Sequence, residues 1–278
     1  MTILLQVLPA VLYALLGIHF WRSRWSDSGQ PIGTNPTLRR LTPWERTTLL
    51  SGIMLQGAGL YLLLFPNGAM NFGFSYALSL IAWLALVFYW IENFYARIEG
   101  LQTLAMPMAA ICVLLPLAFP GQHVLANAGS PVFRAHFLMA MLAYSLFTLA
   151  ALHALLMAAA EKRLHKGRLS RALAGLPPLL TMEALLFRLI AIAFVLLTLT
   201  LGTGVVFSET LFGKAFRFDH KTVFAIASWL MFGALLIGRR LRGWRGRIAL
   251  RWTLAGFVTL LLAYVGSRFV LEVVLNRA

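Results

Sequence analysis

The amino-acid sequence predicts an all-α protein, a polytopic membrane helix bundle of about eight transmembrane helices with both termini outside. The first observation is composition: 60% of the 278 residues are hydrophobic and 12% are charged, about half the charged fraction of soluble domains. The second is that the apolar residues gather in runs of about 20, the length that crosses the hydrocarbon core of a bilayer. The third is an unequal distribution of cations between the connections.

The expected spans leave no room for a second folded domain, so residues 1–278 are expected to form a single transmembrane domain. The first span has no basic leader and no clear cleavage site, and we expect it to be retained. Pro107 and Pro116 are expected to bend the fourth span or break its ends. Gly202 and Gly204 end the sixth and suit close helix contact. In chain order the eight spans are 3–20, 47–65, 72–90, 101–119, 135–157, 185–207, 222–237 and 252–270.

Cations set the predicted orientation. Most of the 24 Lys and Arg residues lie in the connections after the first, third, fifth and seventh spans. The positive-inside rule assigns those connections to the cytoplasm and both termini to the outside. The net charge of +15 is therefore membrane-anchoring charge. It predicts contact with anionic lipid at the inner face and no nucleic-acid partner.

Cysteine usage limits the chemistry. Cys112 is the only cysteine, so an intramolecular disulfide, a CxxC dithiol and a CxxCH haem attachment are all excluded. The protein is neither a thiol oxidoreductase nor itself a c-type cytochrome. The chain also lacks HExxH, Walker and nucleotide-binding glycine motifs.

The six histidines divide evenly between the two predicted sides. His136 and His220 stand at the outer ends of the fifth and seventh spans and can face one shallow outer pocket, where two neutral imidazoles suit axial ligation of haem iron. The alternative is a pair of interfacial residues satisfied by water. His153 is about 25 Å further along the fifth span at the standard rise and cannot share that site. The others are His19 and His165 on the inner side and His123 in an outer loop.

Cations accompany the outer histidines although the orientation rule disfavours them there. Carboxylate binding, such as that of haem propionates, would explain their presence; lipid headgroups or pairing with Asp219, Glu209 and Glu272 are the alternative. Nearby phenylalanines could line a flat apolar ligand or anchor the interface. The cations are Arg134, Lys214, Arg217, Lys221 and Arg268, and the phenylalanines are Phe207, Phe212, Phe216 and Phe218.

Several segments carry a resemblance to a known family. They are MEALLFR running into LLTLTLGTG, then FDHKTVFAIASWLMFGALL, GWRGR and LAGFVTLLLAYVGSRFVLE. These segments resemble the cytochrome c assembly superfamily of the CcsA, CcmC and HemX type, and most closely its YpjD branch of eight-span bacterial inner (cytoplasmic) membrane proteins. The resemblance covers about two-thirds of the chain.

The resemblance implies a function in cytochrome biogenesis. In haem-delivering members two outer histidines ligate the haem, and His136 and His220 are the counterparts here. It implies non-covalent haem b as cofactor, other cytochrome biogenesis membrane proteins as partners, and a haem chaperone or assembly factor rather than an enzyme. The polar residues expected near the haem are Arg134, Arg217, Lys221, Arg268 and Asp219.

Two departures from the family pattern keep other functions open. The segment 211–219 keeps a glycine, aromatics and the aspartate but has no tryptophan, and the second span has Gln56 where family members tend to carry a histidine. A transporter or transport-accessory protein that has lost haem handling is the main alternative. A structural scaffold is the third.

Overall fold

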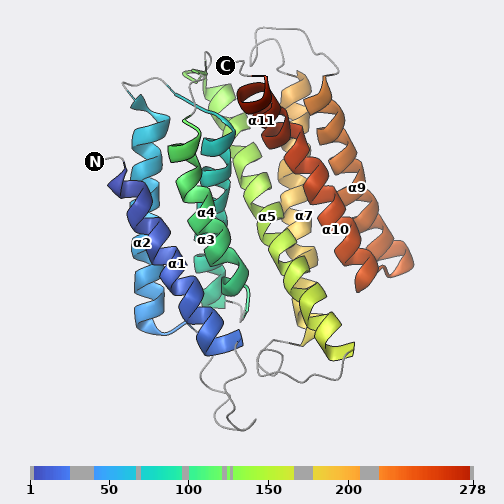
Figure 1. Cartoon of the computed structure of the whole chain (residues 1–278). Helices are drawn as coiled ribbons and strands as arrows, with labels where there is room; N and C mark the ends of the chain where they lie inside the picture. Colours follow the sequence, from blue (N-terminus) through green and yellow to red (C-terminus); the bar gives the residue numbers. More distant parts are fainter. Residues whose placement is uncertain are drawn as a thin grey trace.

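The computed structural model describes residues 3–25, 41–66, 70–95, 100–120, 124–125, 128–165, 178–206 and 219–275. Long helices lie side by side along a common direction (Figure 1). Apart from one isolated bridge between Asn71 and Val124, the regular structure in these ranges is helical. In chain order the elements are α1 (Leu4–Phe20), η1 (Trp21–Trp25), α2 (Pro43–Leu64), α3 (Phe74–Tyr95), α4 (Gln102–Ala118), α5 (Pro131–His165), α7 (Leu179–Val206), α9 (His220–Arg242), α10 (Arg247–Leu261), η3 (Leu262–Gly266), α11 (Ser267–Phe269) and η4 (Val270–Val274).

The predicted all-α membrane bundle is confirmed. Seven of the described helices are long and apolar enough to cross a membrane, and α10 to η4 count together as one of them. The remaining predicted span, the fourth in the chain, is α4, an apolar helix of 17 residues, about 25 Å long at the standard rise. The α-helix runs through both Pro107 and Pro116 and ends at Ala118. Neighbouring helices can compensate for the backbone donor that a proline removes from a membrane helix.

Several helices are longer than the apolar runs that predicted them. The fifth span was expected at 135–157 and α5 covers Pro131–His165; the seventh was expected at 222–237 and α9 covers His220–Arg242. Hydropathy marks only the part of a helix that matches the hydrocarbon, while backbone hydrogen bonding continues beyond it. The α9 extension carries three arginines in its last turn, where cations interact favourably with the helix dipole.

The helices form two groups of four that meet along α5. Helices α1 to α4 lie on one side in Figure 1 and α5, α7, α9 and α10 on the other, and α3 packs against α5 between them. Within the first group the Tyr13 hydroxyl donates to Gln56 Oε1 at 3.0 Å, and Gln56 Nε2 donates to the Ser79 carbonyl at 3.2 Å. In the second group the rings of Phe147 and Phe232 stack with centroids 3.9 Å apart.

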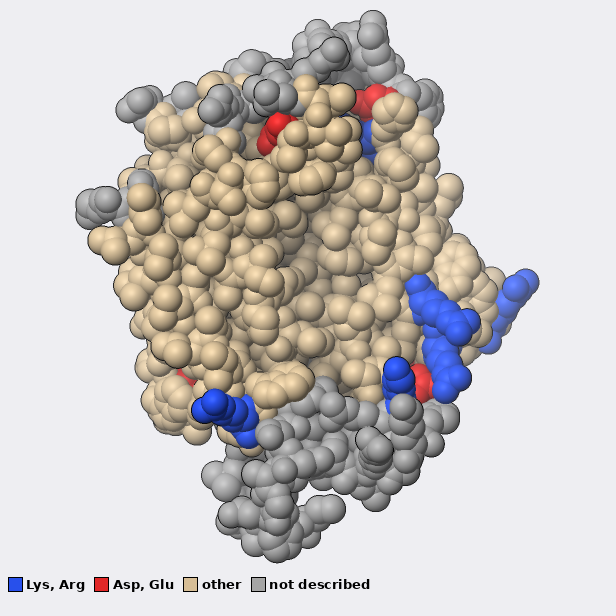
Figure 2. All heavy atoms as spheres, in the orientation of Figure 1, with Lys and Arg blue, Asp and Glu red and all other residues tan. Residues whose placement is uncertain are grey.

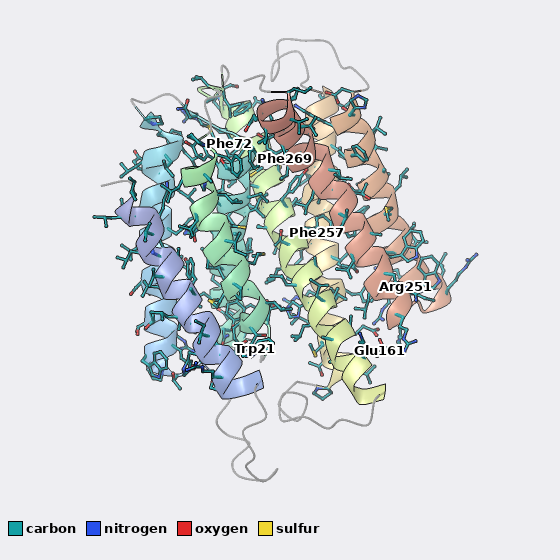
Figure 3. All side chains as sticks on the ribbon, in the orientation of Figure 1. Trp21, Phe72, Glu161, Arg251, Phe257 and Phe269 are labelled. Carbon is teal, nitrogen blue, oxygen red and sulfur yellow. The ribbon has the colours of Figure 1, made fainter. Side chains whose placement is uncertain are left out.

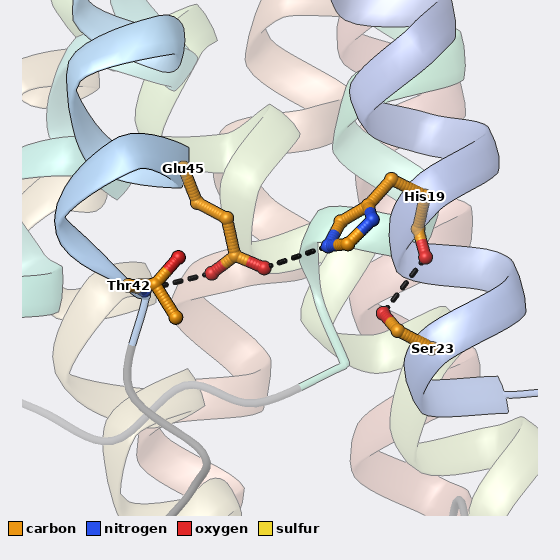
Figure 4. Close-up of polar contacts among 4 residues, drawn as sticks. All are labelled: His19, Ser23, Thr42 and Glu45. Atoms are coloured by element: carbon orange, nitrogen blue, oxygen red, sulfur yellow. Dashed lines mark hydrogen bonds and ion pairs between the residues drawn. The ribbon is translucent and has the colours of Figure 1, made fainter.

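A buried carboxylate ties α1 to α2 at the lower end of Figure 1. Glu45 is 2% exposed; its Oε2 accepts from the Thr42 backbone N–H at 2.7 Å and its Oε1 lies 2.9 Å from His19 Nε2 (Figure 4). The Ser23 hydroxyl donates to the His19 carbonyl one turn further on. His19 therefore lies at the helix end where we expected the inner interface, and it has an internal partner there.

Charge is segregated between the two ends of the bundle. On the face in Figure 2, Lys and Arg gather mainly at the lower end and a wide uncharged belt lies above them. The first turn of α1 and the last turn of η4 both lie toward the upper end (Figure 1). The first and last described helical turns thus share one end, and the positive-inside rule predicts that this upper end faces outward.

Candidate functional site

His136 lies in the second turn of α5 at the upper end of the bundle and is half-buried. Its Nδ1 lies 2.9 Å from the hydroxyl of Thr203, near the end of α7. The contact fixes the plane of the imidazole relative to both helices, which is how outer partners orient a ligating histidine in metal sites. His220, the first residue of α9, lies at the same end and is exposed.

Aromatic side chains extend from the neighbour of His136 to the last helix. The ring of Phe137 meets the ring of Phe72 edge-on, with centroids 4.9 Å apart. The centroids of the Phe72 and Tyr264 rings are 5.8 Å apart. Phe74 packs edge-on against Phe269 at 5.3 Å, and Figure 3 labels Phe72 and Phe269 near the top of the bundle. We call these five residues the aromatic cluster. The four phenylalanines that the sequence suggested for this role lie outside the described residues.

Charged side chains lie against this aromatic cluster. The Tyr264 hydroxyl is beside the guanidinium of Arg268, and Arg268 and Glu272 are both close enough to Lys221 for their charges to interact. Glu272 Oε2 accepts a hydrogen bond of 3.2 Å from the backbone N–H of Phe74. Among the described residues, Arg268 Nε and Glu272 Oε1 are buried without a hydrogen-bond partner. Buried polar atoms of this kind are rare in proteins and call for a partner.

The helix that carries Arg268 changes its winding beside the site. α10 continues through the π-helical turns η3 and η4, and α11 with Arg268 lies between them. Just before η3 the carbonyl of Leu260 accepts a 2.9 Å hydrogen bond from the hydroxyl of Tyr144 on α5. Single π-helical turns inside α-helices are frequent at functional sites.

Asp219 has a structural role that the sequence reading did not assign. Its side chain caps α9, with Oδ1 accepting from both the backbone N–H and the hydroxyl of Thr222 at 2.9 Å. Partial burial acts to raise the pKa of Asp219, but these hydrogen bonds and the charges of Lys221 and His220 outweigh it and lower the pKa. The Asp219 carboxylate therefore fixes the helix start that presents His220.

The other predicted site residues are not drawn into one group by the described contacts. Arg134 is exposed, and its Nε donates to the carbonyl of Ala128 at 2.9 Å. Arg217, Lys214, Glu209 and His123 lie outside the described residues. The structure thus unites Lys221, Arg268 and Glu272, and it links His136 to Thr203 instead.

Two further polar residues lie inside the bundle away from this end. His153 is fully buried in α5, and among the described residues neither of its ring nitrogens has a hydrogen-bond partner. Because α5 is continuous from His136 to His153, the expected separation of about 25 Å holds. Gln56 is 1% exposed, and its amide is engaged by Tyr13 and Ser79.

Three contacts at the bundle ends were missed in the sequence. Thr203 stands between Gly202 and Gly204, and the sequence indicated only close helix contact at the two glycines. Glu272 was expected to pair with a nearby cation, and its additional hydrogen bond from the Phe74 backbone N–H at the start of α3 was not predicted. Thr42 and Glu45 have the spacing of a capping box, a signal that identifies a helix start from the sequence alone.

The model of the family described as Cytochrome C assembly protein matches residues 44–275. The chain is 33% identical over 175 residues to inner membrane protein YpjD of Escherichia coli (strain K12), a match that covers 62% of this chain and 65% of YpjD. The matched segment therefore spans less than two-thirds of that relative's length.

Other relatives match over shorter segments. The chain is 38% identical over 88 residues to cytochrome c biogenesis protein CcsA of Prochlorococcus marinus (strain MIT 9515), which is 32% of this chain and 28% of CcsA. It is 32% identical over 92 residues to the CcsA of Gloeobacter violaceus, 33% of this chain and 27% of that protein. No solved structure matches. Because the family model extends over most of the chain, from residue 44 to residue 275, the protein belongs to the cytochrome c assembly protein family.

Proposed function

We propose that this protein binds haem b non-covalently at the upper end of the bundle and holds or presents it at the outer membrane face during cytochrome c assembly. Family membership supports the class of function, and relatives matched over part of the chain are cytochrome c biogenesis proteins. The likeness to an inner membrane protein supports a multi-pass location in a bacterial inner membrane. The role is that of a haem chaperone or assembly factor, with other cytochrome biogenesis membrane proteins as partners.

The observation that carries the proposal is the buried Nε atom in the half-buried side chain of Arg268. Its Nε has no hydrogen-bond partner among the described residues, and Lys221 adds a second positive charge beside it. A propionate carboxylate would supply the missing acceptor and form a charge-assisted hydrogen bond. Glu272 offsets part of this positive charge and, through the Phe74 N–H, holds η4 against the start of α3.

The partly exposed rings of the aromatic cluster, Phe137, Tyr264 and Phe269, suit the apolar face of a porphyrin. Phe72, Phe137 and Tyr264 form a contiguous set of ring contacts between α5 and the last helix. The Tyr264 ring lies beside Arg268, and lower local polarity strengthens a hydrogen bond between the guanidinium and a carboxylate. The residues present therefore fit a flat, apolar ligand with an anionic edge.

His136 and His220 are the proposed axial ligands. Haem, when bound, would supply an iron that imidazole nitrogens can ligate. Thr203 orients the His136 ring through Nδ1, and the Asp219 cap fixes the helix turn on which His220 stands. Arg134 is exposed at this end and is proposed to add positive charge near the propionates. The proposal gives Arg217 the same role, although it lies outside the described residues.

Haem binding by the purified full-length chain tests the proposal. We would express the protein in haem-replete cells, purify it in mild detergent, and measure haem content before and after titration with hemin. The variants are His136→Ala and His220→Ala, with His19→Ala as the matched control because His19 binds Glu45 at the opposite end. We expect near-stoichiometric haem in the wild type and the control and a clear loss in both site variants. A well-folded wild type that takes up no haem would refute the proposal.

A further inference from the structure

A groove of about 430 Å³ opens at the lower end of the bundle, between the end of α5 and the start of α10. Figure 3 labels Glu161 on α5 and Arg251 on α10, the two helices that form its sides. The apolar lining consists of Ala158, Leu250 and Leu254, and Leu250 is buried. This end lies opposite the histidine site, so the groove is independent of the proposed haem chemistry.

The rim of the groove is cationic. Arg247 Nε donates to Glu161 Oε1 at 2.7 Å, which engages the one carboxylate in the lining. Lys162 and Arg251 are exposed beside that pair. Three cations against one anion leave an excess of positive charge, which favours an anionic group bearing several acceptor oxygens.

The groove changes from a charged rim to an apolar interior along its helices, as a lipid changes from headgroup to acyl chain. Lys162 lies in the last turn of α5 and Arg247 is the first residue of α10, so both cations stand at helix ends, where the lipid headgroups are expected. Leu254 lies two helical turns beyond Arg247, about 10 Å deeper at the standard rise. An amphipathic ligand can therefore bind the rim through its headgroup and the leucines through its chain.

We infer that this groove seats an anionic phospholipid, with its phosphate between Lys162 and Arg251 and an acyl chain along Leu250 and Leu254. Inorganic phosphate would leave the apolar lining unused, and a zwitterionic lipid would leave the excess positive charge unmatched. Each cation near a membrane surface contributes attraction of about 1 kcal/mol toward anionic lipid, or roughly fivefold in affinity.

The test measures binding of short-chain phosphatidylglycerol to the full-length protein in detergent. The groove variant is Lys162→Gln/Arg251→Gln, and the matched control is Arg240→Gln/Arg242→Gln, which removes the same charge from exposed positions at the end of α9. We expect the groove variant to bind at least tenfold more weakly and the control less than threefold. Circular dichroism and melting confirm the fold, and Arg251→Glu alone serves as a second variant if the double substitution lowers yield.

Three outcomes would overturn the inference. One is an equal loss of affinity in the groove variant and the control, which would mean diffuse attraction by the whole cationic end. Another is equal binding of short-chain phosphatidylcholine, which would mean that the charge is not used. The third is displacement of the lipid by inorganic phosphate at matched concentration, which would identify a phosphate site without a lipid requirement.

Discussion

Glu183 joins α7 to the turn between α9 and α10, and its substitution is the sharpest test of the packing at the lower end. The Glu183 side chain is 9% exposed and forms an ion pair with Arg239, whose side chain is 26% exposed. The guanidinium carbon of Arg239 also lies 4.3 Å from the centroid of the Phe187 ring. Glu183 Oε2 accepts from the Gly246 backbone N–H at 3.4 Å. Glu183→Gln keeps the shape of the side chain and removes its charge.

The expected cost follows from this partial burial. Removing one partner of a buried ion pair costs about 3–5 kcal/mol, because the other charge stays buried without compensation. Residual exposure of Arg239 lets water solvate its guanidinium, so we expect a loss of about 2–3 kcal/mol in the free energy of unfolding. Arg239→Gln should cost a similar amount, and the double variant should cost less than the sum.

The assay is reversible unfolding of the purified protein by SDS titration in mixed micelles. Arg240→Gln is the control, because it removes one charge from an exposed position on the next residue of α9, and we expect it to change stability by less than about 0.5 kcal/mol. Two results would contradict a stabilising ion pair between Glu183 and Arg239. One is strictly additive losses of stability from the two substitutions, and the other is a loss in Glu183→Gln no larger than that of the control.

Four further predictions address the upper end and the membrane core. Thr203→Val should weaken haem binding tenfold or more without unfolding the chain, because the hydroxyl that orients His136 is lost. Hemin titration measures this change in affinity. Gln56→Leu should lower the free energy of unfolding by about 1–2 kcal/mol in the same SDS assay, because Tyr13 and Ser79 both lose their hydrogen bond to the amide inside the bundle. Asp219→Ala should lower the free energy of unfolding by about 1 kcal/mol, because α9 loses its N-terminal cap. Because its folded-state pKa is lowered from the ordinary 3.8, the stability that this carboxylate contributes is complete above that pH and is lost as pH falls through the lowered value. Finally, a C-terminal alkaline phosphatase fusion should be active in cells and a green fluorescent protein fusion dark, and the reverse pattern would contradict the predicted orientation.

The helices could be predicted because their signal is local. Each apolar run is long enough to cross the hydrocarbon, and no partner needs to be known to recognise it. The exact ends were less predictable, as the extension of α9 to Arg242 illustrates, because polar residues continue a helix without altering its hydrogen bonding. The Asp219 cap and the Glu45 capping box were also readable in principle, since both act within three residues.

The candidate site could be predicted only in part. The sequence placed His136 and His220 at one end because span counting fixes which helix ends lie together. It did not identify Thr203 as the partner of His136, since that contact depends on how α5 and α7 are rotated about their axes. The aromatic cluster was missed for the same reason: Phe72 and Tyr264 are far apart in the chain and meet only after the two helix groups pack.

Ligation of haem iron by His136 and His220 can be tested by oxidised and reduced absorption spectra of the purified wild type and of the two alanine variants. We expect a low-spin bis-histidine spectrum in the wild type that is lost in both His136→Ala and His220→Ala. A low-spin spectrum that persists in both variants would contradict it, as would a well-folded wild type that remains spectrally silent after hemin titration.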